Sequence, residues 1–427
     1  MIGVLGGGIS GISAAYHLSL KNKQTVIFEA KNSWGGLCDN FRLDDFLFDN
    51  CIHLSFSNDD YVNALFANST GLIKHIPNPS NYYKGKWLKH PAQNNIYSLD
   101  INEKIEIIKG FIDREKEINV SEIADFETWL RKQYGNYFAE NFPVKYGLKY
   151  WTIEAKSMTT EWIKDRMYQP SLDEVLFGSY TEETPLTYYA KEMRYPTKGG
   201  YKAFLSGMAS ACDIRLNHEV THINTQNKYI EFKNGKKEQY ESLISSLPLP
   251  VLINCLDVPL SVQTAAENLI ASSVFIVSIG LNKLSPKKDL WFYIYDEDIL
   301  AARVYSPSLK SSFNAPEYCS SFQFEIYSSK YKSINMSNDN LLNHIIETAV
   351  QKLHLFEKDD IKVTDVRFIP YGNVIFDQSY RKNRKIVHDW LDTCNIKYIG
   401  RFGEWDYLWS DQSLLSGKKC IDKHYSL

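Results

Sequence analysis

The chain has 427 residues, a net charge of −3 and 23% charged residues, so it is long enough for two or three structural lobes. The near-balanced charge excludes the basic field that nucleic acid binding requires. No apolar run is long enough to span a membrane, and the seven cysteines form no Cys-x-x-Cys pair, so we expect neither zinc nor a disulfide framework. Because Met1 leads directly into an apolar run, we expect no signal peptide and a reducing cytoplasmic location.

The N-terminal segment carries a dinucleotide-binding fingerprint. Residues 4–11 read VLGGGISG and place Gly6, Gly8 and Gly11 in a Gly-x-Gly-x-x-Gly pattern after an apolar run. Gly6 permits the tight turn, Gly8 lets the backbone approach a pyrophosphate, and Gly11 lets the helix pack on the strand. The N-terminus of that helix offers free N–H groups and the positive end of its dipole to the phosphates.

A second apolar run, residues 25–28, ends at Glu29, where a carboxylate can accept a hydrogen bond from a ribose hydroxyl. Gly35 and Gly36 follow, and this second glycine pair favours FAD over NAD. The segment therefore predicts a β-α-β unit that binds FAD. We expect the FAD to be non-covalent, because the chain shows no established flavin-attachment motif.

Residues 101–170 have the pattern of helices. Ile105 and Ile108 recur at helical spacing. Asp125 is placed as an N-cap, and Gly135 as a helix stop. This segment predicts a helical lobe.

Strands dominate the next part of the chain. Residues 215–250 predict strands with a hairpin turn at Asn234-Gly235. Residues 399–403 predict an apolar strand that ends in glycine, followed by a helix with Asp411 near its start. An antiparallel sheet is predicted from the runs at 274–281, 291–295, 301–305 and 322–327.

These elements predict an α/β fold with a discontinuous, Rossmann-like FAD-binding domain, a helical substrate lobe and an antiparallel sheet domain that also contacts substrate. The expected boundaries are 1–85, 195–260 and 385–427 for the FAD-binding domain, 86–194 for the helical lobe and 261–384 for the sheet domain.

Six segments in chain order carry a resemblance: residues 48–56, 87–95, 151 with 162–166, 195–200, 291–303 and 400–407. Together they resemble the UDP-galactopyranose mutase family, particularly its eukaryotic-type branch, within the wider amine oxidase and protoporphyrinogen oxidase type of FAD fold. The first resembles that family's histidine loop beside the flavin, and the second a segment that lines its nucleotide pocket. The last resembles its C-terminal flavin motif.

The resemblance implies a flavin-dependent mutase that interconverts pyranose and furanose forms of a nucleotide-diphosphate sugar without net redox change. Reduced FAD would act through N5 as the nucleophile on the anomeric carbon. NAD(P)H would be the external reductant, although no second Gly-x-Gly-x-x-Gly indicates a dedicated NAD domain. Arg166 and Arg303 would clamp the diphosphate with charge-assisted hydrogen bonds. Tyr293 and Tyr407 would add hydroxyl donors, and His53 would approach the flavin.

Further contacts follow from the fingerprint and the resemblance. Asn373 stands where the family has another phosphate-facing tyrosine. The other residues expected at the substrate are Trp151, Phe56, His90 and Gln93. Those expected at the cofactor are Gly6, Gly8, Ser10, Gly11, Glu29, Gly35, Gly36, Leu37, Val220, Gly400, Arg401 and Asp411. The alternative roles are core packing for Trp151 and the tyrosines, and an ordinary hydrogen-bonded side chain for His53.

Departures from the family pattern bear on the substrate. Cys51 and Ile52 replace two glycines before the loop histidine. His90, Ala92 and Gly147 stand where a tyrosine, a phenylalanine and an asparagine surround uridine in the eukaryotic-type enzymes. We therefore expect a nucleotide sugar other than UDP-galactose, for example a dTDP-linked 6-deoxyhexose whose thymine methyl fills the room beside Ala92.

Two other functions remain open from the sequence. One is a flavin oxidase or desaturase of the amine oxidase or protoporphyrinogen oxidase type, which needs no pair of diphosphate-binding arginines. The other is a non-catalytic protein that binds FAD or a nucleotide sugar.

Overall fold

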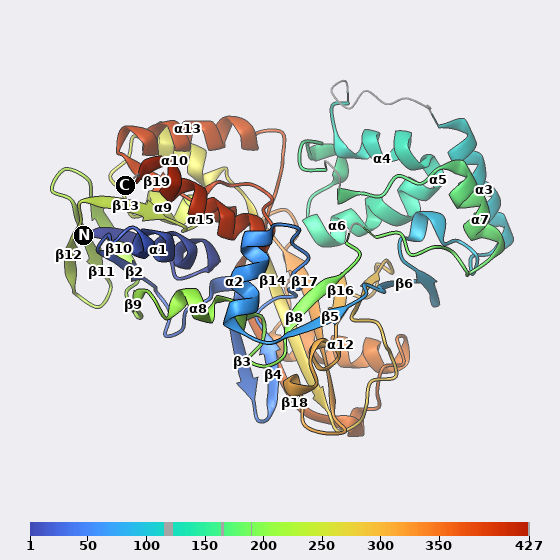
Figure 1. Ribbon diagram of the computed structural model, residues 1–427. Helices are drawn as coiled ribbons and strands as arrows, with labels where there is room; N and C mark the ends of the chain where they lie inside the picture. The colour runs from blue at the N-terminus through green and yellow to red at the C-terminus, as the bar shows by residue number, and fades with distance from the viewer. Residues whose placement is uncertain (115–122, 164–165, 189, 426–427) are drawn as a thin grey trace.

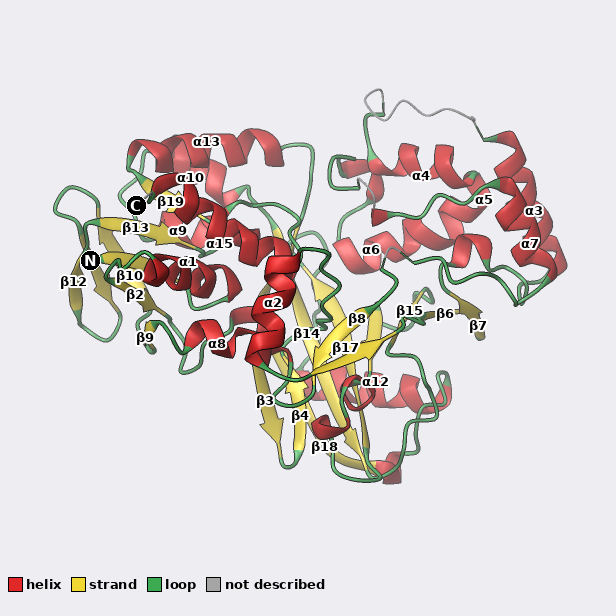
Figure 2. Ribbon diagram, in the orientation of Figure 1, coloured by secondary structure: helices red, strands yellow, loops and turns green. Residues whose placement is uncertain are grey.

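The structure, a computed structural model, describes residues 1–114, 123–163, 166–188 and 190–425. Three regions surround its centre (Figure 1): a nucleotide-binding region with both termini, a large sheet and a lobe built of helices. Figure 2 shows that strands gather in the first two regions and that helices make up the third. None of the helices in these described ranges combines the length and the apolar character that a membrane crossing needs.

A parallel five-stranded sheet forms the centre of the nucleotide-binding region. Its strand order is β19-β13-β1-β2-β9, and the predicted β-α-β unit lies in the middle of it. The helices α1 (Ile9–Leu20) and α15 (Ser410–His424) pack against each other. The strands are β1 (Ile2–Leu5), β2 (Thr25–Phe28), β9 (Asp213–Arg215), β13 (Ser242–Ser245) and β19 (Ile396–Tyr398). Apolar runs such as β1 are buried, as expected for a covered parallel sheet.

A small antiparallel sheet and several helices complete this region. The sheet contains β10 (Val220–Asn224), β11 (Tyr229–Phe232) and β12 (Lys237–Gln239), and the predicted turn at Asn234-Gly235 joins the last two strands. Gly235 has a φ of 81°, which glycine adopts without strain. The helices are α8 (Ser206–Ala209), α9 (Leu249–Asn254), α10 (Leu260–Glu267) and α13 (Tyr380–Thr393).

The large sheet has seven strands in the order β18-β14-β17-β16-β15-β6-β7. They are β6 (Ser80–Tyr83), β7 (Lys86–Lys89), β14 (Ala271–Leu281), β15 (Trp291–Ile294), β16 (Arg303–Tyr305), β17 (Ser320–Ser328) and β18 (Ile361–Val374). Helix α12 (Asn338–Gln351) packs its apolar face on the sheet through Leu341 and Ile345. The sheet is antiparallel, as predicted, except that β15 and β6 run parallel.

The helical lobe contains α3 (Ile101–Asp113), α4 (Phe126–Tyr134), α5 (Asn136–Ala139), a π-helical turn (Glu140–Val144), α6 (Lys145–Trp151) and α7 (Leu172–Tyr180). The predicted cap of α4 is present, because the Asp125 carboxylate accepts a hydrogen bond from the Thr128 N–H at 2.8 Å. Gly135 ends this helix with a φ of 76°.

Short elements connect the three regions. They are β3 (Asn40–Leu43), β4 (Phe46–Asp49), α2 (Asp60–Ser69), β5 (Leu72–His75), β8 (Met193–Pro196), α11 (Pro307–Lys310) and α14 (Gly400–Gly403). β3 pairs with β4 and β5 with β8, each antiparallel.

Two expectations about these elements were wrong. The predicted strand at 399–403 ends earlier, at Tyr398, and residues 400–403 form α14, because the Gly400 φ of 75° turns the chain out of the extended conformation. Residues 80–89 belong to the large sheet, whereas the predicted boundaries divided them between the FAD-binding domain and the helical lobe. The open edge of β15 pairs with β6, which draws this hairpin into the sheet.

Candidate functional site

The glycine fingerprint forms an open cradle at the N-terminus of α1. Gly8 is the N-cap, and a Cβ added there would meet no atom within 4 Å. By contrast, a Cβ on Gly11 would lie 2.0 Å from the Gly6 carbonyl oxygen, so that position requires glycine. Free N–H groups of the first helical turn and this empty space fit the pyrophosphate of a dinucleotide.

Glu29 and the second glycine pair stand beside this cradle. The Glu29 carboxylate accepts hydrogen bonds from the Gly7 N–H at 2.7 Å and the Lys31 N–H at 2.9 Å, so its orientation is fixed. Each carboxylate oxygen keeps a further lone pair for a ribose hydroxyl. Gly35 donates its N–H to the Gly7 carbonyl at 2.8 Å, which holds the second glycine loop against the first.

A cavity of about 940 Å³ lies where the nucleotide-binding region, the large sheet and the helical lobe meet. Twelve predicted site residues line it: Leu37, His53, Phe56, His90, Gln93, Trp151, Arg166, Tyr293, Arg303, Asn373, Arg401 and Tyr407. Ten predicted cofactor residues do not line it: Gly6, Gly8, Ser10, Gly11, Glu29, Gly35, Gly36, Val220, Gly400 and Asp411. Val220 begins β10 and lies apart from the others. The other nine lie in the α1 cradle, or beside it in the second glycine loop, α14 and α15.

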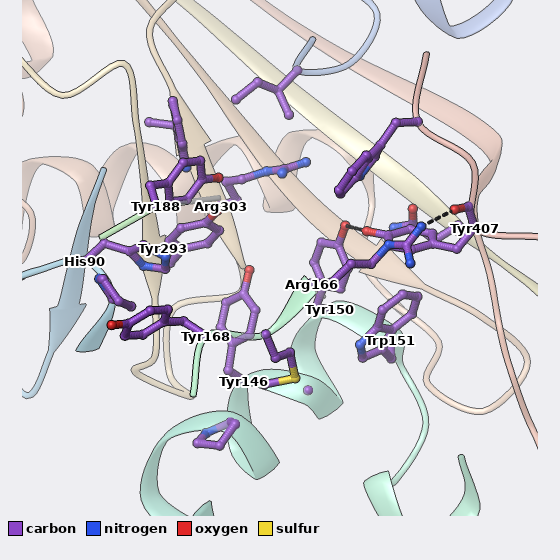
Figure 3. Close-up of a pocket in the computed structure, with 18 of the residues that line it drawn as sticks. His90, Tyr146, Tyr150, Trp151, Arg166, Tyr168, Tyr188, Tyr293, Arg303 and Tyr407 are labelled. Atoms are coloured by element: carbon purple, nitrogen blue, oxygen red, sulfur yellow. Dashed lines mark hydrogen bonds between the residues drawn. The ribbon is translucent and has the colours of Figure 1, made fainter. Parts of the chain in front are cut away.

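Arg303 occupies the sheet side of the cavity (Figure 3). Its Nε donates to the Glu325 Oε2 at 2.7 Å, and Nη2 lies 2.6 Å from the same oxygen. The hydroxyl of Tyr327 also donates to this oxygen, at 2.9 Å. Because the Glu325 side chain is only 1% exposed, the guanidinium supplies the charge that makes a buried carboxylate tolerable.

Arg166 occupies the opposite side, close to the C-terminal motif. Its Nη2 donates to the Tyr407 carbonyl at 2.7 Å and its Nη1 to the Trp162 carbonyl at 3.0 Å. The guanidinium also lies 4.8 Å from the centre of the Tyr407 ring. Arg401 faces the same ring at 5.4 Å. The cavity thus has cationic groups on both sides, as Figure 3 shows for Arg166 and Arg303. Residues 164–165 of the predicted 162–166 segment lie outside the described residues.

His53 approaches the cavity from the loop after β4. Its Nδ1 lies 3.1 Å from the Cys51 carbonyl oxygen, which can only accept, so Nδ1 carries the proton and Nε2 is an acceptor. Burial lowers the pKa of His53 to about 4. At neutral pH this histidine is therefore an uncharged acceptor and cannot act as a cationic acid.

The other predicted substrate residues occupy different walls. Gln93 donates from its amide to the Tyr168 carbonyl at 2.9 Å, which leaves its oxygen available as an acceptor. His90 lies 3.1 Å from the Asn81 Oδ1, and its ring centre is 5.0 Å from that of Tyr293. Asn373 accepts from Arg401 at 3.2 Å. Ala92 is fully buried and does not line the cavity, so the expected room for a thymine methyl beside it is absent.

Several cavity residues were missed by sequence reasoning. They are Glu325, Tyr327, Tyr146, Tyr150, Tyr188 and Trp409. Gln323, Glu325 and Tyr327 are alternate residues of β17, so they lie on the same face of the strand. This alternation of polar side chains is visible in the sequence and could have indicated a polar face. The described residues bring together no group of three or more His, Cys, Asp or Glu side chains placed to hold a metal ion.

Acidification should destabilise the protein through two half-buried histidines, His53 and His90. Burial lowers the pKa of His53 to about 4 and that of His90 to about 3, from an ordinary 6.5. The unfolded chain therefore binds more protons between pH 4 and 6.5, and stability falls as the pH drops through this range. We expect each histidine to cost about 1–2 kcal/mol at pH 5 relative to pH 7.

Urea unfolding at pH 5 and pH 7 measures this effect. A His90→Asn variant should lose less stability than the wild type between the two values. Equal losses in both proteins would contradict the neutral state of His90.

The fold and the cavity define a flavoprotein of the Rossmann-like, amine oxidase type. Residues 9–341 match the family of flavin containing amine oxidoreductases, and the chain belongs to this family. The predicted α/β class with an FAD-binding fold is confirmed.

Several solved structures superpose on nearly the whole of this chain. A reduced UDP-galactopyranose mutase superposes with a TM-score of 0.92 at 23% identity, covering 99% of this chain and 94% of that one. A putative protoporphyrinogen oxidase from Exiguobacterium sp. 255-15 gives 0.75 at 15% identity, with 99% and 98% covered. Putrescine oxidase bound to putrescine gives 0.66 at 13% identity, with 99% and 98% covered. The predicted resemblance to the mutase family is thus confirmed at the level of the fold.

Proposed function

We propose that the protein is a flavin-dependent mutase that interconverts the pyranose and furanose forms of a nucleotide-diphosphate sugar. The observation that carries this proposal is the placement of Arg303 and Arg166 on opposite sides of one cavity. Two guanidinium groups that converge from different regions suit a ligand with two adjacent phosphates. An amine substrate, which is itself a cation, would not call for this pair of cations.

The chain's own residues have distinct tasks in this proposal. The α1 cradle, Glu29 and the second glycine loop hold FAD, whose reduced form supplies a nucleophile at N5. Arg303 and Arg166 bind the diphosphate and stabilise its charge while it is separated from the sugar. Tyr293 and Tyr407 add hydroxyl donors, and the uncharged His53 accepts a hydrogen bond without bringing a competing cation. The apolar walls of the cavity exclude water from the reacting sugar.

Turnover should require reduced flavin but consume no reductant stoichiometrically. The protein is loaded with FAD, reduced with dithionite under anaerobic conditions and given nucleotide sugars, and the isomerised product is separated by chromatography. In a parallel assay with NAD(P)H, reductant loss should stop once the flavin is reduced while product continues to form. One NAD(P)H consumed per product would make the protein an oxidoreductase, and tight binding without any turnover would make it a binding protein.

The preferred substrate should be a nucleotide sugar other than UDP-galactopyranose. His90 and Gly147 line the cavity and offer neither the aromatic hydroxyl nor the amide that the resemblance places around uridine. A base whose polar groups stay unpaired in a closed pocket is bound less tightly. We expect kcat/KM for at least one nucleotide sugar with another base to exceed that for UDP-galactose by about 10-fold, which corresponds to one lost hydrogen bond. A tenfold advantage for UDP-galactose would refute this preference but not the mutase activity.

A further inference from the structure

Two tyrosines of α6 face the cavity and have no role in the site described so far. Tyr146 and Tyr150 are four residues apart in one helix, so both side chains emerge on the same face. Their ring centres are 6.0 Å apart, and the ring planes differ by 17°. Figure 3 shows both side chains rising from the helix into the view, with Tyr150 beside Arg166 and Tyr407 and with Tyr146 below Arg303.

Tyr146 presents a hydroxyl group that the protein does not use. The oxygen is buried and has no hydrogen-bond partner among the residues that the structure describes. The ring centre lies 5.9 Å from that of Tyr293 and 5.2 Å from that of Tyr295, so aromatic packing fixes its direction. A buried hydroxyl without a partner costs free energy, and such a group is expected where a ligand supplies the partner.

Tyr150 connects the two sides of the cavity. The Arg303 guanidinium lies 5.9 Å from the centre of its ring. Its hydroxyl oxygen is 3.4 Å from the Tyr407 hydroxyl oxygen, a distance at the outer limit of hydrogen bonding. Tyr407 in turn packs against Arg166. A ligand oxygen placed between the two hydroxyl groups would offer each a shorter bond than they form with each other.

The protonation state of both tyrosines makes them donors. Burial raises the pKa of Tyr146 and of Tyr150 well above the ordinary value of 10. Both hydroxyl groups therefore keep their protons at any working pH. Since Arg303 and Arg166 are also donors only, the centre of the cavity calls for an anion rich in acceptor atoms.

We propose that Tyr146 and Tyr150 bind the phosphate oxygens of a diphosphate ligand between Arg303 and Arg166. The inference rests on the proposed function, in which the substrate is a nucleotide-diphosphate sugar. Under this proposal the helical lobe binds the diphosphate directly, in addition to the two arginines and to Tyr293 and Tyr407.

Equilibrium binding of UDP and dTDP to the FAD-loaded protein tests the proposal. Tyr146→Phe and Tyr150→Phe each remove one oxygen atom. Loss of a hydrogen bond to a charged group should weaken the binding of both diphosphates by about 10- to 100-fold. Tyr137→Phe is the matched control, because that tyrosine belongs to the same lobe, its hydroxyl donates to Glu103 at 3.3 Å, and it does not line the cavity.

Thermal stability separates ligand binding from a structural role. Tyr146→Phe removes a hydroxyl without a protein partner, so the melting temperature of the ligand-free protein should not fall. The loss of affinity should be smaller for UMP and dTMP, which offer fewer phosphate oxygens. Diphosphate affinities equal to wild type in both variants would overturn the inference and leave the proposed function standing. A wild-type protein that binds none of UDP, dTDP, GDP and CDP, with oxidised or reduced flavin, would refute the proposed function itself.

Discussion

Arg303→Ala should lower kcat/KM by about 10- to 100-fold, while the FAD content stays at the wild-type level. The guanidinium lines the cavity and is held by Glu325, whereas the α1 cradle lies outside the cavity, so only the substrate side is altered. The loss should be larger if the contact strengthens as the diphosphate separates from the sugar. Arg166→Ala should act in the same direction, since Arg166 lies on the opposite side.

The buried carboxylate of Glu325 needs a control of its own. Arg303→Ala leaves that carboxylate without its cation, which by itself destabilises the protein. The double variant Arg303→Ala/Glu325→Gln removes the stranded charge and should recover stability but not turnover. Arg367→Ala provides the matched control, because Arg367 belongs to the same sheet but pairs with Asp365 outside the cavity. Wild-type kinetics in both Arg303→Ala and Arg166→Ala would exclude the diphosphate clamp.

The nucleotide-binding unit was predictable because its determinants are local in sequence. Gly6, Gly8 and Gly11 follow one another closely at the junction of β1 and α1. A Cβ on Gly6 or Gly11 would collide with protein atoms, whereas Gly8 leaves open space for a ligand. The return of residues 242–245 and 396–398 to the same sheet depends on long-range pairing, which short apolar runs do not specify.

The cavity residues likewise include some that a local motif identifies and others that only tertiary contacts place. Arg303 was assigned through a motif, but its partner Glu325 lies on the neighbouring strand and is fixed by the β16–β17 register. The alternation of Gln323, Glu325 and Tyr327 indicates a polar strand face without showing which residue that face meets. Tyr150 is one of 28 tyrosines, and its contact with Tyr407 joins a helix and a loop from distant parts of the chain. Such contacts follow from tertiary packing and have no local signature.

Gly8→Ala should weaken FAD binding without harming the fold. Gly8 has a φ of −78°, which alanine adopts readily, and an added Cβ would meet no protein atom within 4 Å. The methyl group would instead occupy the space in front of the α1 N-terminus, where we place the pyrophosphate. Overpacking of a close contact costs about 1–3 kcal/mol, so FAD affinity should fall by about 5- to 100-fold.

Acid precipitation followed by absorbance of the supernatant measures the bound FAD, and all flavin of the wild type should be released because it is held without a covalent bond. Gly147→Ala is the matched control, since its added Cβ also meets no atom within 4 Å but lies in the substrate cavity, and it should retain FAD. Gly11→Ala should instead impair folding, because its Cβ would collide with the Gly6 carbonyl oxygen at 2.0 Å. A Gly8→Ala protein with wild-type flavin content would show that the pyrophosphate does not approach this turn, and the cofactor would have to bind elsewhere in the fold.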